Sequence, residues 1–600
     1  MNLLLYRRTT GMLDLQRNNL DKSLSPYLLQ HMANPVWWQE WSSDVLRSAV
    51  AAKRPLFVSV GYATCHWCHV MASEAFSDRE TADFLNSHYV CIKVDREQRP
   101  DIDQYLMRFL AAQSGSGGWP LNVFLTADLR PVYALTYAPV HSGGAQRSFL
   151  SIAEMVYDHY EKNADDIAPF TSEEEYLPVA TEESLVEDLL SYHDPVYGGF
   201  GLGQKFPPHS TLLYLLFFLC VENNSAVQEV CSKTLDVMRL RGLNDHLQGG
   251  VFRYCVDRKW TIPHFEKMLY DQAMALWCYA LAYKVMGNAA YKKMAESIVR
   301  CLDECFADNG LFIAAHDADT EHREGATYVW SYDELKAFLT ADEFKRFAES
   351  YSIDKQGNFE GLIHLIRKNA VALPDIEEKL LSLRKKRAQP ARDDKILCGI
   401  NALVAIALIQ AGRNLGQPEL VEKAAQTIRR LIDLFWDGKA LGHSHFGGVR
   451  QTQSFLFDAA ALLTAISMLY EDDSSWSDLL EAIAVYVESF REGEKWVESR
   501  AADFHQVYAA LFDHPVPSSI SLAEMGLARV ALFAGKETKA QSYLPPYQAD
   551  FFNITGMMKN GLFHLITAES IVPWSQLPAN ALQRRGKPQT DCYRGICRML

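Results

Sequence analysis

The sequence lacks any apolar segment of the length that crosses a membrane or directs secretion. The N-terminal apolar run, residues 3–6, precedes Arg7 and Arg8, whereas a secretory signal places its positive charges before a longer apolar stretch. A second apolar run, residues 212–221, is too short for a membrane span and is typical of a core helix. We therefore expect a cytoplasmic protein without a membrane partner, with a mitochondrial leader as the alternative.

Basic residues are also scarce. The 59 Lys and Arg residues are outnumbered by 74 Asp and Glu residues, which gives a net charge of −15. Because nucleic-acid binding needs a basic face, we expect no nucleic-acid partner.

Paired cysteines are rare, since Cys65 and Cys68 form the single C-x-x-C motif among twelve scattered cysteines. This distribution is typical of reduced thiols in a reducing compartment and not of a secreted disulfide framework. The sequence is 48% hydrophobic and 12% aromatic, which argues against disorder. With 600 residues it exceeds what one hydrophobic core usually supports, so we expect two or more domains.

The surroundings of the C-x-x-C motif predict a reactive dithiol. Residues 56–60 are apolar and β-branched and predict a buried strand, whereas residues 69–76 have helical spacing. A helix that begins at Cys65 offers partial positive charge and free N–H groups, which favour the Cys65 thiolate over the thiol. His66, between the two cysteines, would add to this effect when protonated.

Three other interpretations of this motif stay open. Cys65, Cys68 and His69 match the attachment pattern of c-type haem, which needs an exported chain. The two thiolates with His66 or His69 could bind zinc, although no second C-x-x-C motif lies nearby to complete the site. The two cysteines could also be a purely structural buried pair.

The elements around the motif follow the order of a thioredoxin-like α/β domain. Pro120 opens an apolar strand after Trp119, where this fold places a cis-proline that faces the dithiol. An ordinary proline at a strand start is the alternative. The predicted helices are residues 42–53, 77–86 and 102–113, and the predicted strands are residues 56–60, 89–95, 121–126 and 132–135.

Residues 19–139 carry long motifs that resemble a known family. These motifs are SPYLLQH, GYATCHWCHVM, IKVDREQRPDID and GGWPLNVFLT. They are similar to those of the spermatogenesis-associated protein 20 family and its bacterial relatives. The resemblance implies a thioredoxin-like domain followed by a long helical domain, an (α/α)6 toroid as in six-hairpin glycosidases and sugar 2-epimerases.

One position departs from thioredoxin itself. The buried carboxylate that thioredoxin carries on the strand before its dithiol corresponds to Ser59 here. Proton transfer would therefore need another group, and Glu74, Asp95 and the rings of His66 and His69 are the candidates.

The predicted domain organisation has four parts. Residues 1–18 form a disordered or loosely ordered tail, residues 19–164 the thioredoxin-like domain, residues 165–183 an acidic, proline-containing linker, and residues 184–600 the helical domain. Periodicity alone predicts a large all-α domain, and similar Gly- and aromatic-rich loops between helix pairs suggest a repeat. The predicted helices are residues 182–193, 210–222, 226–241, 264–286, 289–306, 397–413, 420–436, 454–470 and 477–490.

Ionisable residues in the loops of the helical domain predict a second site. Asp317, Asp319 and Asp394 could act as general acid and base on a sugar. His246 or His264 could abstract a proton next to a carbonyl, as an epimerase needs.

Near His264, Glu266 and Asp271 follow Pro263, which we expect at a helix start. Each acid could instead be a helix cap or part of an ion pair, and Asp317 with Asp319 also permits a calcium interpretation.

The sequence favours a thiol–disulfide oxidoreductase or a redox-responsive protein. Cys65 would be the nucleophile and Cys68 the resolving thiol, with His66, Trp119 and Pro120 shaping the approach of a protein thiol or disulfide partner. The alternatives are a sugar 2-epimerase or glycosidase-like enzyme acting on a small carbohydrate, and a non-catalytic interaction protein. We expect no cofactor and no metal.

Overall fold

A computed structural model gives the fold, and contacts divide the chain into two units. Unit 1 contains Met1–Glu173 and Ala501–Val507, and unit 2 contains Glu174–Arg500 and Tyr508–Leu600. The predicted helical domain included residues 501–507, whereas the contacts place these residues in unit 1. The structure describes residues 14–144, 146–171, 182–536, 563–586, 591–593 and 596–598.

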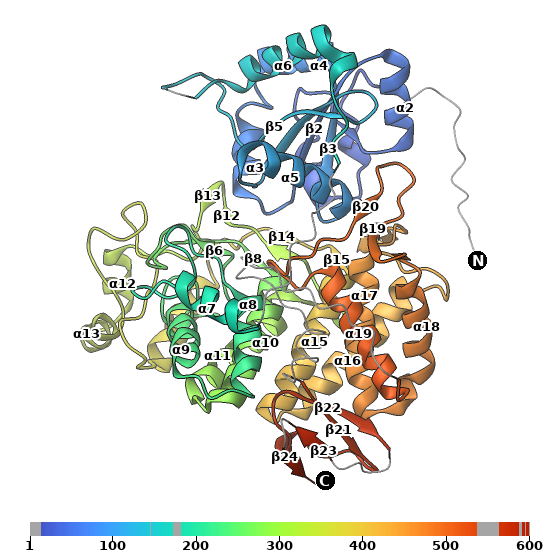
Figure 1. The fold of residues 1–600 in the computed structure, drawn as a ribbon. Coiled ribbons are helices and arrows are strands. Elements are labelled where there is room, and N and C mark those ends of the chain that lie inside the picture. Colours follow the sequence, from blue (N-terminus) through green and yellow to red (C-terminus); the bar gives the residue numbers. More distant parts are fainter. Residues whose placement is uncertain are drawn as a thin grey trace. The chain divides into compact units, whose positions relative to one another are not determined.

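Unit 1 is built on a five-stranded sheet with the strand order β1-β3-β2-β4-β5 (Figure 1). Strand β3 pairs in parallel with β1 and β2, whereas β4 pairs antiparallel with β2 and β5. The strands are β1 (Gln39–Glu40), β2 (Leu56–Gly61), β3 (Val90–Asp95), β4 (Leu121–Leu125) and β5 (Pro131–Leu135).

Helices surround this sheet and confirm the thioredoxin-like fold. Ser42 caps α2 by accepting a hydrogen bond from the backbone of Val45, as a serine at a helix start does. The helices are α1 (Pro26–Gln30), α2 (Ser43–Ala52), α3 (His66–Ser73), α4 (Arg79–His88), α5 (Pro100–Ser114) and α6 (Phe149–Asn163), with 3-10 turns at Leu20–Lys22 and Ala164–Asp166.

Alternation along β2 separates the two faces of the sheet. Leu56, Val58 and Val60 belong to a core shared with residues of α2 and α5. Phe57 points to the other face, where its ring lies near those of Phe76, Phe124 and Phe149 and of Trp38. Ser59 lies on this second, aromatic face.

Described residues at both ends of the predicted first domain pack on unit 1. Leu15 packs against the sheet core, and the Asn18 side chain donates hydrogen bonds to two backbone carbonyls. Residues 1–13 of the predicted tail and 172–181 of the predicted linker lie outside the described residues. Phe170 accepts a hydrogen bond from Tyr105, so the start of the linker packs on α5.

The return segment is fixed to unit 1 by charge and aromatic contacts. Asp503 accepts two hydrogen bonds from Arg99, at 3.0 and 3.1 Å. The ring of Phe504 contacts that of Trp41 edge-on at 5.4 Å. The sequence around Arg99 and the sequence around Asp503 do not predict this pairing, because the two residues lie about 400 positions apart.

Unit 2 alternates outer and inner helices, which confirms the (α/α)6 fold (Figure 1). The described part contains five such pairs. The outer helices are α7 (Glu182–Tyr192), α9 (Ser225–Leu240), α11 (Ala289–Cys301), α16 (Pro418–Phe435) and α18 (Ser477–Glu488); the inner ones are α8 (His209–Leu219), α10 (Leu269–Met286), α15 (Cys398–Leu415), α17 (Leu456–Asp472) and α19 (Ser519–Phe533).

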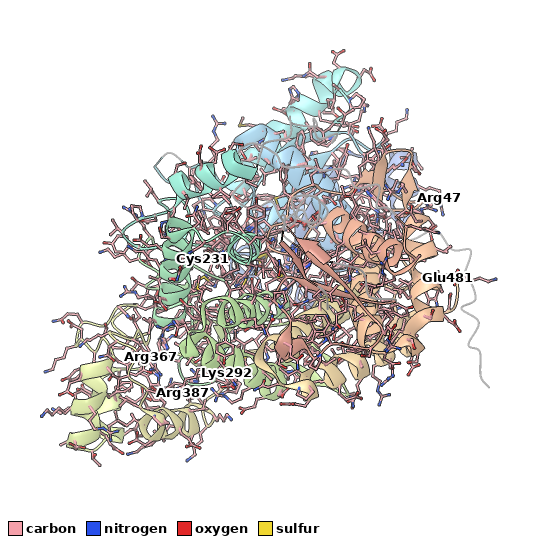
Figure 2. The ribbon with its side chains drawn as sticks, turned by 60° about the horizontal axis from the view of Figure 1, so that its bottom comes forward. Arg47, Cys231, Lys292, Arg367, Arg387 and Glu481 are labelled. Carbon is pink, nitrogen blue, oxygen red and sulfur yellow. A yellow bond between two sulfur atoms is a disulfide. The ribbon has the colours of Figure 1, made fainter. Side chains whose placement is uncertain are left out.

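The burial of each helix explains its layer. The outer helix α9 buries Val227, Val230, Cys231, Thr234 and Leu235, the spacing of one apolar face. The inner helices are buried on nearly all sides and pack against one another: α10 against α8 and α15, and α15 against α17. Figure 2 shows Cys231 within this helical unit, where its free thiol is buried.

Helix α15 corrects the expectation that no apolar segment is long enough for a membrane. By length and composition α15 could cross a bilayer, but 89% of it is buried inside unit 2. It is therefore a core helix.

Unit 2 also contains an insertion that sequence analysis did not predict. It holds α12 (Tyr332–Phe338), α13 (Ala341–Ser350) and α14 (Pro374–Arg384), which surround a small core. Arg367 and Arg387, labelled in Figure 2, fasten this insertion: Arg367 pairs with Glu377 at 2.6 Å, and Arg387 stacks on Trp330.

Short strands line the loops of unit 2. They include the hairpins β6 (Tyr254–Cys255) with β7 (Pro263–His264) and β12 (Asp319–Thr320) with β13 (Arg323–Glu324). The others are β8 (Lys267–Met268), β9 (Ala307–Asp308), β10 (Leu311–Phe312), β11 (Ala315–His316), β14 (Arg392–Asp393), β15 (Ile396–Leu397), β16 (Ser444–Phe446), β17 (Val449–Arg450), β18 (Arg491–Glu492), β19 (Lys495–Ser499), β20 (Val507–Tyr508), β21 (His564–Ala568), β22 (Ala581–Arg585), β23 (Asp591–Tyr593) and β24 (Ile596–Arg598).

The hairpin β6–β7 overturns one prediction. We expected Pro263 at the start of a helix that runs over residues 264–286, but α10 begins only at Leu269. Tyr254 pairs instead with His264 in the hairpin, so residues 263 and 264 form a strand although their sequence pattern predicts a helix.

Candidate functional site: a dithiol and an acid–base cluster

The two cysteines of the motif lie at the start of α3 and are joined by a disulfide. Cys65 is the N-cap of α3, and its sulfur accepts a hydrogen bond from the backbone N–H of Cys68 at 3.3 Å. Strand β2 ends four residues earlier at Gly61, so a strand, a short loop and a helix hold the pair as the sequence predicts. Free N–H groups at this helix end favour a negative sulfur.

Trp119 and Pro120 precede β4, the strand that pairs antiparallel with β2. The peptide bond between them is cis, as predicted. The Trp119 ring contacts the ring of Tyr62 edge-on at 5.9 Å, and its Nε1 donates a hydrogen bond to Asp103 at 2.7 Å. Trp119 is therefore fixed beside the loop that leads to Cys65.

Each candidate proton acceptor near the dithiol has at least one neighbour other than the two sulfurs. Glu74 accepts a hydrogen bond from Tyr137 at 2.7 Å, and Asp95 accepts one from Ser25 at 2.6 Å. Nε2 of His69 lies 2.8 Å from the backbone carbonyl of Ala63, whereas the ring of His66 lies against that of Trp67.

The disulfide is buried in this structure. Cys65 is 3% exposed and Cys68 is 1% exposed, whereas Trp67 between them is 48% exposed. In the disulfide form the two sulfurs also cannot both serve as zinc thiolates.

Sequence analysis missed a polar group beneath the dithiol. Lys93 on β3 is the register partner of Ser59 and is 1% exposed. Its Nζ lies 2.9 Å from the Ser59 hydroxyl and 3.0 Å from the Tyr27 hydroxyl. Gly61 permits the close approach of Tyr27, because a Cβ at Gly61 would lie 2.4 Å from the Tyr27 oxygen and 2.7 Å from the Cys68 sulfur.

We expect the Gly61→Ala variant to be destabilised by about 1–3 kcal/mol, because the new methyl group overpacks a buried site. Gly143→Ala is the matched control in unit 1, since nothing lies within 4 Å of its added Cβ. Thermal unfolding measures both. Equal melting temperatures for the two variants would contradict the close packing of Tyr27 against Cys68.

In unit 2 a second cluster of ionisable groups forms around His264. Its Nδ1 lies 2.6 Å from Glu324, and its Nε2 lies 3.7 Å from Glu266. Burial alone would lower the pKa of His264, but the hydrogen bond with Glu324 and the nearby charges of Glu266 and Asp319 outweigh it and raise the pKa. Asp319 is the register partner of Glu324 in the β12–β13 hairpin.

Asp271, in the first turn of α10, is the second titratable group of this cluster. Burial raises its pKa to about 7, although Arg253 opposes this shift. The Arg253 guanidinium lies 3.6 Å from Asp271 Oδ2 and forms no hydrogen bond with that oxygen among the described residues. The surroundings thus raise the pKa of both His264 and Asp271 and favour the protonated form of each group.

Asp271 predicts a pH dependence of stability. Its folded pKa lies above the unfolded value, so the folded chain keeps a proton that the unfolded chain loses, and stability falls as the pH rises from about 4 to about 7. We expect Asp271→Asn to reduce this fall, as measured by melting temperature across that pH range. A variant profile that parallels the wild type would contradict the assignment.

Two acids and one histidine predicted for this site have other surroundings. His246 places its ring nitrogens 3.1 Å from the Asn244 side chain and from the carbonyl of Arg241, and burial lowers its pKa to about 3. Asp317 is buried and accepts a hydrogen bond from the backbone of Asp319. Asp394 is exposed and pairs with Arg392.

The sequence missed Glu324 and Arg253, the closest charged neighbours of His264 and Asp271. No local signal could have found them. His264 and Glu324 lie 60 residues apart, and only the two hairpins bring them together.

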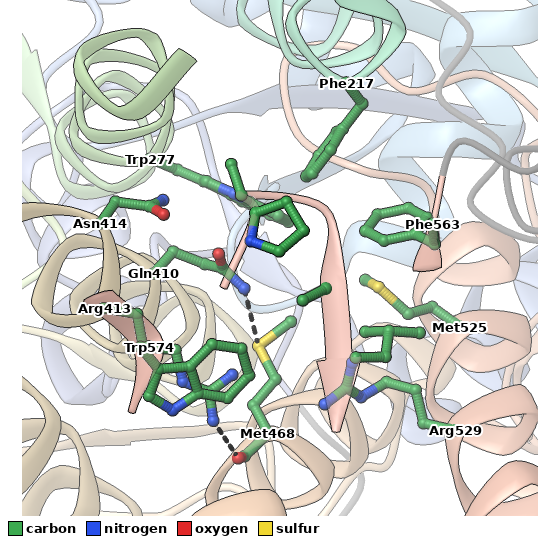
Figure 3. Close-up of a pocket in the computed structure, with 14 residues that line it drawn as sticks. Phe217, Trp277, Gln410, Arg413, Asn414, Met468, Met525, Arg529, Phe563 and Trp574 are labelled. Atoms are coloured by element: carbon green, nitrogen blue, oxygen red, sulfur yellow. Dashed lines mark hydrogen bonds between the residues drawn. The ribbon is translucent and has the colours of Figure 1, made fainter. Parts of the chain in front are cut away.

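A small cavity elsewhere in unit 2 is not a carbohydrate site. Its volume is about 20 Å³, enough for a water molecule but not for a sugar. Figure 3 shows its lining, in which Arg413 stacks on Trp574 and donates a hydrogen bond to the carbonyl of Met468.

The fold and the dithiol together define a class: a thioredoxin-like domain with a C-x-x-C motif, joined to an (α/α)6 domain. The family model Thioredox_DsbH, described as "Protein of unknown function, DUF255", matches residues 17–176. Spermatogenesis-associated protein 20 of Mus musculus is 31% identical over 534 residues, which cover 76% of this chain and 68% of the mouse protein. The chain therefore belongs to the spermatogenesis-associated protein 20 family, as its motifs predicted.

Two solved structures are similar to this chain over part of its length. A D-mannose isomerase matches 61% of this chain and 85% of its own, with 11% identity and a TM-score of 0.40. A DsbH oxidoreductase matches 21% of this chain and 86% of its own, with 22% identity and a TM-score of 0.17.

Proposed function

We propose that this protein is a thiol–disulfide oxidoreductase in which Cys65 is the nucleophile and Cys68 the resolving thiol. The observation that carries the proposal is the position of Cys65 as the N-cap of α3, with its sulfur bonded to Cys68 and hydrogen-bonded by an N–H of the helix. A sulfur at this position is a good leaving group and, when reduced, a good nucleophile.

The proposed reaction consists of two thiol–disulfide exchanges, and each one forms one disulfide bond and breaks another. The reduced Cys65 thiolate attacks one sulfur of a partner disulfide, which forms a mixed disulfide and releases a partner thiolate. Cys68 then loses its proton and attacks Cys65, which restores the Cys65–Cys68 disulfide and releases the second partner thiol. The partner gains two electrons and two protons, and an external dithiol must reduce the protein again.

Turnover of a disulfide peptide tests the proposal. We expect the protein to accelerate the reduction of an oxidised dicysteine peptide by dithiothreitol above the rate in buffer alone. The control is protein that has been reduced and then alkylated under native conditions. Equal rates with untreated and alkylated protein would contradict the proposal.

A second candidate function belongs to unit 2 and involves a different chemistry. The contact of His264 with Glu324 and the raised pKa of Asp271 support proton transfer next to a sugar carbonyl. The test is exchange of the C2 hydrogen of aldoses with deuterium from solvent. We expect exchange with the wild type and its loss in His264→Ala; no exchange across common aldoses would count against this candidate.

A further inference from the structure

We propose that Lys93, through the hydroxyl of Tyr27, takes the proton of the Cys68 thiol when Cys68 resolves a mixed disulfide at Cys65. This inference rests on the proposed thiol–disulfide exchange and names the base for its second step. It also supplies a proton acceptor in place of the thioredoxin carboxylate, because Ser59, which occupies that position here, is no base at neutral pH.

The first link of the relay is the approach of Tyr27 to Cys68. Their oxygen and sulfur both lie within 3 Å of the position that a Cβ of Gly61 would take, at 2.4 and 2.7 Å. Only a glycine leaves this space open. Tyr27 lies on α1 and is fully buried, and its hydroxyl and the Cys68 sulfur lie on the same side of Gly61, where the reduced Cys68 thiol would be its neighbour.

The second link is the hydrogen bond between Tyr27 and Lys93, at 3.0 Å. The Lys93 nitrogen also lies 2.9 Å from the Ser59 hydroxyl and 4.6 to 5.1 Å from the ring centroids of Phe76, Trp38 and Tyr27. The described residues offer no carboxylate in an ion pair with Lys93. Burial without a carboxylate partner favours the neutral amine, whose lone pair can accept a proton.

The charges that face Lys93 agree with this state. Burial lowers the pKa of Lys93 well below its usual value, and it also lowers that of His31, the C-cap of α1, so His31 is neutral. Burial and the charge of Asp95 raise the pKa of Tyr27, which keeps the phenol protonated. Asp95, two residues from Lys93 on β3, accepts a hydrogen bond from Ser25. His69 also lies close enough to influence the pKa of His31.

Two proton transfers accompany the resolving step. Cys68 gives its proton to the Tyr27 oxygen while Tyr27 gives its own proton to the Lys93 amine. The Cys68 thiolate then attacks Cys65 and the partner thiolate leaves. Lys93 then returns its proton, by way of the Tyr27 hydroxyl, to the departing partner sulfur or to solvent, so the base is unchanged after each turnover.

The test follows one turnover of the reduced protein with 5,5′-dithiobis(2-nitrobenzoate). Attack by Cys65 releases one thionitrobenzoate, and resolution by Cys68 releases a second, so the two steps appear as two phases of absorbance. The variants are Lys93→Met and Tyr27→Phe, which keep the packing, with the exposed Lys22→Met as the control. Protein with both Cys65 and Cys68 replaced by alanine gives the background of other thiols.

We expect an unchanged first phase and a second phase slowed ~10–100-fold in both variants, the usual scale for loss of a positioned base. The slowing should shrink as the pH rises, because hydroxide then deprotonates Cys68, and the double variant should be no slower than either single one. A second phase as fast as in the wild type would overturn the inference alone. An absent first phase in the wild type would overturn the proposed function and the inference with it.

Discussion

We expect replacement of Cys65 with serine to lower the rate of the proposed thiol–disulfide exchange by at least ~10³-fold, because the variant lacks the sulfur that we propose as the nucleophile. Replacing Cys68 with serine has a different result. Cys65 still attacks, but the mixed disulfide with the partner is not resolved and accumulates. Mass spectrometry of the intact protein after mixing with an oxidised dicysteine peptide measures both outcomes.

The control for these variants is Cys220→Ser. Cys220 is a partly exposed free thiol of unit 2, and its sulfur donates a hydrogen bond to the carbonyl of Leu216. This variant should exchange at the wild-type rate and form no mixed disulfide. If the mixed disulfide persists in Cys65→Ser but disappears in Cys220→Ser, the nucleophile is Cys220 of unit 2 and the proposal is contradicted.

Replacing Asp245 with alanine destabilises unit 2 by about 3–5 kcal/mol, the cost of breaking one side of a buried ion pair. Asp245 lies 2.7 Å from the Lys267 amine and 2.8 and 2.9 Å from the Arg384 guanidinium, and all three side chains are buried. Without the carboxylate, two positive charges stay buried, and the described residues offer neither of them another ion-pair partner. Thermal unfolding of the full chain, followed by circular dichroism of the helices, measures the loss.

Acid should act on the same site. Burial opposes ionisation of Asp245, but the charges of Arg384 and Lys267 outweigh it and hold the pKa of Asp245 far below its usual value. The stability that this carboxylate contributes is therefore present above its unfolded pKa and is lost as the pH falls toward the folded one.

Two further variants isolate the charge effect. Adding Lys267→Met to Asp245→Ala removes one of the two unpaired cations and should restore part of the stability. Asp375→Ala, which breaks an exposed pair with Arg346, should leave the melting temperature unchanged. A single Asp245→Ala variant as stable as Asp375→Ala would show that the buried network does not hold the loops together.

The dithiol could be predicted because its signals are local. Six consecutive residues make β2, and the helix after Cys65 follows within a few residues, so pattern and propensity agree. Lys93 could not be found in this way. It stands between Ile92 and Val94, and the rings that cover it come from Tyr27, Trp38 and Phe76, which only the tertiary fold brings to β3.

The cluster of ionisable groups around His264 was also predicted only in part. His264, Glu266 and Asp271 were found because they lie close together in the sequence, but their charged neighbour Glu324 comes from another hairpin. The helix expected at Pro263 was wrong because the pairing of Tyr254 with His264 decides the local structure. Short-range patterns thus predicted elements and missed the long-range pairs that set the pKa values.

Equilibrium of the wild-type protein with glutathione redox buffers tests the central claim most directly. We predict that the Cys65–Cys68 pair changes from dithiol to disulfide over a defined range of glutathione ratios, reaches the same end point from both directions, and shifts no other cysteine pair. Acid quenching, alkylation and peptide mapping give the fraction oxidised. A Cys65–Cys68 pair that keeps its starting state in every buffer, with the chain folded, would contradict the account.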